Sequence, residues 1–149
     1  MAVTQEEVQQ YPVRQKVLEK LETLLGTGKP LVGVYPVHRT HFDGYPSATF
    51  QPSDVGSDYQ TNVQNMRRYV FRVVIHQEAE VVGAEKALDI LWDAMHQVMN
   101  AFDNDFTLGG AVVDTKAVPS VWGAYNEGSG LTFYCEVKLE MLSVYDLSM

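Results

Sequence analysis

Hydrophobic residues recur every three or four positions in two segments of the chain, which predicts two amphipathic helices. In residues 13–25 the apolar positions are Val13, Val17, Leu18, Leu21, Leu24 and Leu25. In residues 84–102 they are Ala84, Ala87, Leu88, Leu91, Met95, Val98, Met99 and Phe102. We expect both apolar stripes to face the core, so Leu88 is predicted to be buried.

Segments with alternating or β-branched residues predict five strands. They cover residues 31–37, 45–51, 67–77, 110–118 and 131–144. The predicted order of helices and strands contains a single helical crossover, which excludes a doubly wound parallel sheet. The predicted fold class is α+β, a mostly antiparallel sheet of four to five strands with two helices packed on one face.

Three segments lack these patterns. Residues 1–12 are polar and are expected to form a flexible N-terminal arm on a single domain of residues 1–149. Residues 51–65 are expected to form a long polar loop that contacts a partner, which makes Asp54, Asp58 and Tyr59 candidate interface residues. The glycine-rich segment 119–130 is expected to be a hairpin loop whose aromatic residues, Trp122 and Tyr125, contact a partner.

The net charge of −8, from 11 basic and 19 acidic residues, disfavours binding to nucleic acid or to an anionic membrane surface. No apolar run approaches the ~20 residues that cross a bilayer, so we expect no membrane partner. The one cysteine, Cys135, cannot form an internal disulfide and is typical of a reduced cytosolic protein. It lies on the apolar face of its predicted strand, so its thiol is expected to be buried, with a raised pKa.

A candidate metal site lies in the loop His-Arg-Thr-His-Phe-Asp-Gly, where His38, His41 and Asp43 could face one ion. Arg39 would oppose a cation there, and we interpret the loop as solvated. A small metal-dependent hydrolase that uses these three residues is the enzymatic alternative. We predict no catalytic, cofactor-binding or metal site and no enzymatic activity.

Arginine is concentrated at one strand. Arg67, Arg68 and Arg72 are three of the eleven basic residues of an otherwise acidic chain. Arginine forms bidentate pairs with carboxylates at interfaces. We expect these three residues to meet acidic groups on a neighbouring subunit or another protein.

The layout resembles the tail terminator proteins of long-tailed bacteriophages. The resemblance covers nearly all of the chain from Val13 onward and follows the order and spacing of its segments. After the leading amphipathic helix, these are Tyr45-Pro46-Ser47-Ala48-Thr49-Phe50, the polar segment, Arg68-Tyr69-Val70-Phe71-Arg72-Val73, Ala87-Leu88-Asp89-Ile90-Leu91, Thr107-Leu108-Gly109-Gly110 and a final long strand.

The resemblance implies a homo-oligomeric ring, commonly of six subunits, that caps the tail tube protein and joins a head-to-tail connector or neck protein. Such a ring would be made in the host cytoplasm and located in the virion, at the neck region of the tail. Six subunits at −8 each carry −48, so DNA would pass through the channel without specific binding. Head-completion or neck connector proteins share this layout and are the alternative.

Overall fold

The computed structural model describes residues 5–39, 42–59, 64–127 and 130–146. Side chains are described from residue 13 onward, except for those of residues 54–59, 64–65, 127 and 145–146. The elements, in chain order, are α1 (Gln5–Glu22), β1 (Gly33–Tyr35), β2 (Ser47–Tyr59), β3 (Gln64–Glu78), α2 (Ala84–Asp103), a short 3₁₀ turn η1 (Leu108–Gly110), β4 (Asp114–Glu127) and β5 (Gly130–Asp146).

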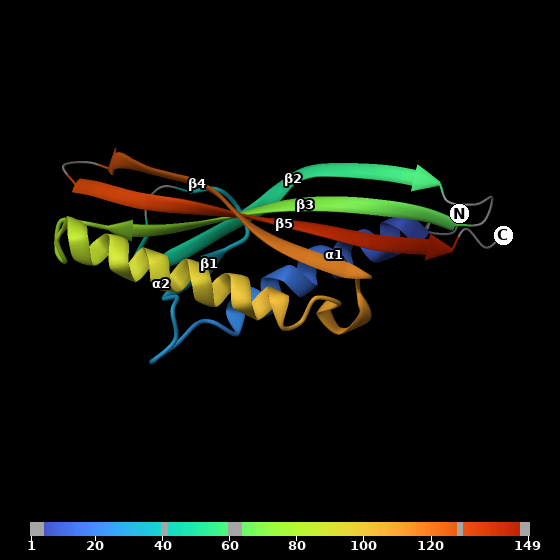
Figure 1. Cartoon of the computed structure of the whole chain (residues 1–149), viewed down its shortest axis with the longest axis horizontal. Coiled ribbons are helices and arrows are strands. Elements are labelled where there is room, and N and C mark those ends of the chain that lie inside the picture. Colours follow the sequence, from blue (N-terminus) through green and yellow to red (C-terminus); the bar gives the residue numbers. More distant parts are fainter. Residues whose placement is uncertain (1–4, 40–41, 60–63, 128–129, 147–149) are drawn as a thin grey trace.

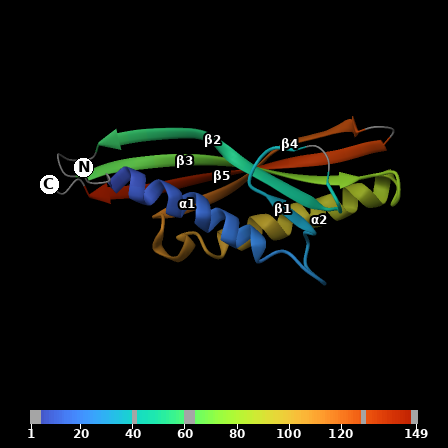
Figure 2. The same ribbon diagram turned by 180° about the vertical axis from the view of Figure 1, so that it is seen from behind.

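The five strands form one sheet in the order β1-β2-β3-β5-β4. Strand β1 runs parallel to β2, and the other neighbours are antiparallel. Both helices lie on the same side of this sheet, α2 beneath one half of its length and α1 beneath the other (Figures 1 and 2). The predicted α+β class, with two helices on one face of a mostly antiparallel sheet, is confirmed.

The core lies between the helices and one face of the sheet. The strand side chains on this face are buried at alternate positions, as their period of two requires: they include Phe50, Tyr69, Phe71, Val73, Ile75, Cys135, Val137, Leu139 and Met141. The helices contribute their own apolar stripes, among them Val13, Val17 and Leu21 from α1. On β3 the buried residues Tyr69, Phe71, Val73 and Ile75 are those that alternate as aromatic and β-branched residues along its sequence.

Helix α2 begins at the predicted residue, but its buried stripe is rotated slightly from the predicted one. The buried residues are Ala87, Leu91, Ala94, Met95, Val98 and Phe102. Leu88 is 41% exposed, so the prediction that it belongs to the core was wrong. Its hydrophobicity placed it in the stripe, whereas helix α2 turns the small side chain of Ala94 towards the sheet instead.

The prediction that residues 51–65 form a polar loop was wrong, because most of this segment is a β-ribbon. Strand β2 extends to Tyr59 and β3 begins at Gln64, and their backbones pair as far as Tyr59 and Asn65. Backbone hydrogen bonds hold this ribbon, so it needs no alternation of apolar side chains. A register shift at Pro52 accommodates the missing N–H of proline within β2.

Residues 119–127 of the glycine-rich segment are likewise strand rather than loop, because β4 continues to Glu127, and residues 128–129 lie outside the described residues. A register shift after Pro119 restores its pairing with β5. Gly123 is required there because a Cβ atom at this position would lie 2.6 Å from the Tyr134 hydroxyl. The predicted arm of residues 1–12 is also corrected from residue 5 onward, where α1 begins.

Two leucines of α2, one inside its buried stripe and one outside it, provide a test of how the helix is rotated against the sheet. We expect Leu91→Asp to prevent folding, because Leu91 has no exposed surface and the charge would be buried without a partner. Leu88→Asp is the matched control and should melt cooperatively, as followed by circular dichroism. A folded Leu91→Asp or an unfolded Leu88→Asp would contradict the observed rotation of α2.

Candidate interaction surfaces

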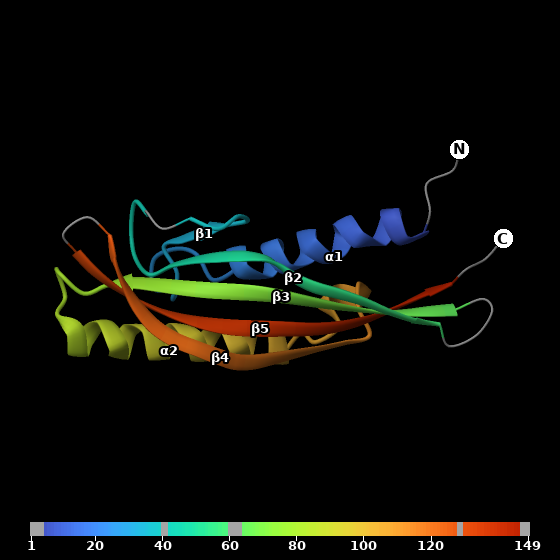
Figure 3. The same ribbon diagram turned by 90° about the horizontal axis from the view of Figure 1, so that it is seen from above.

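The second face of the sheet carries no helix among the described residues, and Figure 3 views the strands from this side. We call it the open face. Its side chains alternate with those of the core and mix charged with apolar residues. By the strand register they include Arg68, Val70, Arg72 and Val74 from β3, Glu136, Lys138, Glu140 and Leu142 from β5, and Lys116 and Val118 from β4.

The three candidate interface arginines do not form one surface. Arg67 lies on the core side of β3 and is buried, whereas Arg68 and Arg72 lie on the open face. The guanidinium of Arg72 donates a hydrogen bond from Nε to Glu136 Oε1 and forms an ion pair with it. The acidic partner of Arg72 is therefore in its own chain. Arg68 is the only one of the three arginines whose residue is classed as exposed.

One end of the open face is closed by an aromatic cluster that the sequence analysis missed. Nδ1 of the buried His76 lies 2.9 Å from the Tyr125 hydroxyl. The ring centroid of Phe42, from the segment after β1, lies 4.6 Å from that of His76. Arg39 lies over Tyr35, 4.1 Å from the ring centroid. The cluster attaches this segment to the sheet, and it gives Tyr125 a structural contact rather than a position at a loop tip.

Burial holds the pKa of His76 at about 4, below its ordinary value of 6.5, and electrostatic repulsion from His38 contributes to the same shift. A neutral imidazole fits this position because aromatic rings surround it. The signal in the sequence was weak: His76 continues the polar alternation of its strand, and its partners lie more than 30 residues away along the chain.

Trp122 lies on the core side of β4, at the edge of the sheet, and remains 39% exposed. Its ring centroid is 5.9 Å from that of Trp92 on α2, and Trp92 packs in turn on His96. The predicted interface tryptophan thus belongs to an exposed pair of indoles. This pairing was not predicted, because residues 119–130 were assigned to a loop and the face of the sheet on which Trp122 lies was therefore unknown.

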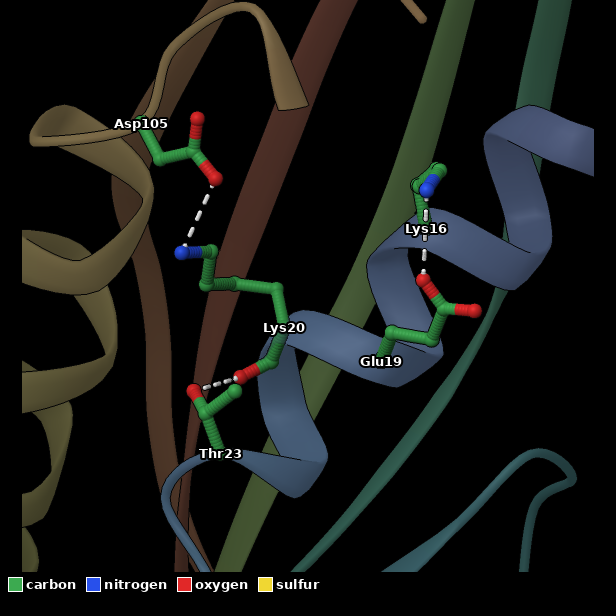
Figure 4. A network of polar contacts seen from close by, with 5 residues as sticks. All are labelled: Lys16, Glu19, Lys20, Thr23 and Asp105. Carbon is green, nitrogen blue, oxygen red and sulfur yellow. Dashed lines mark hydrogen bonds and ion pairs between the residues drawn. The ribbon is translucent and has the colours of Figure 1, made fainter. Parts of the chain in front are cut away.

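A surface hollow of about 210 Å³ lies between α1 and the η1 turn (Figure 4). Lys20 Nζ crosses it to Asp105 Oδ2 at 2.9 Å, and Lys16 pairs with Glu19 at 3.5 Å on the same helix. The hydrogen bond from Lys20 is the main cause that holds the pKa of Asp105 below its ordinary value. Because both lysines are paired, this hollow is a contact between elements rather than an anion site.

Of the three residues of the alternative metal site, His38 and Asp43 are exposed, and His41 lies outside the described residues. No group of three or more histidine, cysteine or acidic side chains suited to a metal occurs among the described residues. Burial raises the pKa of the Cys135 thiol to about 12, which confirms the predicted buried thiol.

Asp54, Asp58 and Tyr59 lie in β2 by their backbone, opposite Val70, Met66 and Asn65, and their side chains are outside the described residues.

No helix in the described part of the chain combines the length and apolar character that a bilayer crossing requires. The sequence matches no protein-family model and no curated protein.

The Arg72–Glu136 pair predicts that removing the arginine alone destabilises the fold more than removing both partners. Arg72→Met should lower the free energy of unfolding by about 2 kcal/mol, because it leaves the buried Glu136 carboxylate without its cation. Replacing both residues by Met should recover most of this loss. Lys138→Met, at the neighbouring position on β5, is the control and should stay within ~0.5 kcal/mol of the wild type in urea unfolding. An equal effect of Arg72→Met and Lys138→Met would contradict the pair.

The lowered pKa of His76 predicts a loss of stability in acid. Between pH 6.5 and about 4 the unfolded chain binds a proton at this histidine that the folded chain does not bind. The free energy of unfolding should therefore fall as the pH decreases through this window, by up to about 3 kcal/mol. His76→Phe should remove that part of the slope in urea unfolding at pH 7, 5.5 and 4.5, whereas His96→Gln, an exposed control on α2, should keep it. An unchanged slope in His76→Phe would assign the acid sensitivity to other groups.

Proposed function

We propose that the chain is a structural, non-enzymatic subunit of the tail terminator of a long-tailed bacteriophage. The observation that carries the proposal is the order of elements on a one-sided sheet. A helix, a long ribbon, a second helix and two long strands follow one another along the chain. The segments on which the resemblance rests fall on these elements in the same order.

The open face supports an assembly role. The helices cover one face of a long sheet, and the other face presents valines and a leucine among charged side chains. In an isolated chain this face would leave apolar side chains exposed to water, and a partner that binds there would cover them. A ring of subunits, with a tail tube protein below it and a neck or connector protein above it, would provide partners on several sides.

Charge supports the same role for the channel. Six subunits with a net charge of −8 each would give the ring −48, and DNA passing through a channel with this charge would be repelled rather than held. The proposal therefore assigns no specific DNA contact to the chain, and it places the protein in the virion, at the neck region of the tail.

A gene knockout in the parent phage tests the proposal. A terminator must bind the end of a tube whose subunits otherwise add without limit, because a head-to-tail contact that does not close generates an open filament. We expect the knockout lysate to contain tubes of uncontrolled length beside filled heads that carry no tail. Electron micrographs of the lysate provide the measurement, and expression of the wild-type chain in trans should restore tail length.

Tails of normal length in that lysate would contradict the terminator assignment. If those tails lay beside heads that leak or fail to attach, the function would be that of a head-completion or neck connector protein. Fully infectious particles would exclude both roles.

A further inference from the structure

An exposed apolar group protrudes where α2 meets the edge strand β4. It consists of Leu88, Trp92 and Trp122, which we call the indole patch. Trp92 is 58% exposed, and Leu88 lies one helical turn before it on the same side of α2. Tryptophan residues that pack against one another and still face water are typical of the centre of a protein interface.

The rim of the indole patch is acidic. Glu85 and Asp89 precede Trp92 by seven and three residues, so they lie on the same side of α2, and both are exposed. Neither carboxylate forms an ion pair with any described residue. Two indole patches brought together around a twofold axis would oppose these carboxylates to their own copies, which disfavours a symmetric dimer through this surface.

A hollow of about 200 Å³ lies on the opposite side of the molecule, on the open face. Arg68 from β3, Lys116 from β4 and Leu142 from β5 line it, together with Asp114 and Glu140. Lys138 follows on the same face, two residues before Glu140 on β5. The hollow therefore combines an apolar side chain, two cations and two carboxylates, and Lys138 beside it makes the surroundings positive by one charge. Its cations can stack on an indole ring or pair with a carboxylate of another chain.

We infer that the indole patch of one copy docks on this hollow of a second copy. Trp92 would fill the hollow, and Glu85 and Asp89 would meet Arg68, Lys116 and Lys138 around it. The two surfaces lie on different sides of one chain, so the contact joins unlike surfaces and repeats from copy to copy. That such a series closes as a ring rests on the proposed function, whereas the contact itself does not.

Complementation between two defective variants tests this geometry. Trp92→Ala removes the protruding ring and leaves the hollow, and Lys116→Glu reverses a charge at the hollow and leaves the ring. Each variant should self-associate about 30-fold more weakly than the wild type, the size typical of an interface hot spot. An equimolar mixture of the two should form dimers and nothing larger, because one intact patch and one intact hollow remain. Sedimentation velocity or light scattering of the full chain measures all three states.

Val81→Ala and Lys29→Glu are the matched controls, because both residues are exposed and lie outside the two surfaces. Both should assemble as the wild type does. Three outcomes would overturn the contact: a wild type that stays monomeric at every concentration reached, variants that assemble normally, or a mixture that forms no dimer. Loss of self-association in Trp92→Ala alone, with normal assembly of Lys116→Glu, would indicate a symmetric contact between two indole patches instead.

The test is separable from that of the proposed function. A monomeric wild type that still restores tail length in the knockout phage would overturn the contact and leave the terminator assignment intact. Mixed dimers, together with normal tails in the knockout, would support the contact and overturn the assignment.

Discussion

The pairing of β3 with β5 is the constraint on which the rest of the structure depends. The two strands run antiparallel from Gln64↔Asp146 to Glu78↔Thr132, at the centre of the sheet. Because side chains alternate between faces, this register decides which residues meet the helices. A slip of one residue would turn the apolar set of one strand to the open face and bury Arg72 or Glu136 under a helix.

Both faces of the sheet acquire their chemistry from that register. On the helix side it aligns Ile75 with Cys135, and α2 can then cover an apolar surface that is continuous across the two strands. On the open face it places Arg72 near Glu136, so that the buried carboxylate has a cation within reach. The result is a chain with two unlike sides, and unlike sides are what the proposed head-to-tail contact between copies would need in order to repeat in one direction.

The sequence predicted the elements whose stability comes from apolar burial. Strand β3 and helix α2 were found because their hydrophobic residues recur with the periods of a strand and a helix. The ribbon of β2 and β3 beyond Pro52 was missed because backbone pairing, which leaves little signal in side-chain hydrophobicity, holds it. The Trp92–Trp122 pair and the His76 cluster could not be predicted, since each joins residues from distant segments through a register that only the folded sheet provides.

The edges of the sheet favour the proposed contact between copies through side chains over one through added strands. Strand β4 forms one edge, but Pro119 supplies no N–H there and the adjacent register shift bends the row of backbone groups. Strand β2 has a similar register shift after Pro52, in its pairing with β3, and β1 pairs with only the first residues of β2. An open-ended sheet would recruit strands of many kinds, including those of unfolded chains. Because both edges are interrupted, the side chains that protrude from α2 and those that line the open face determine the specificity of a contact. Such a contact forms only with a partner of matching shape and charge.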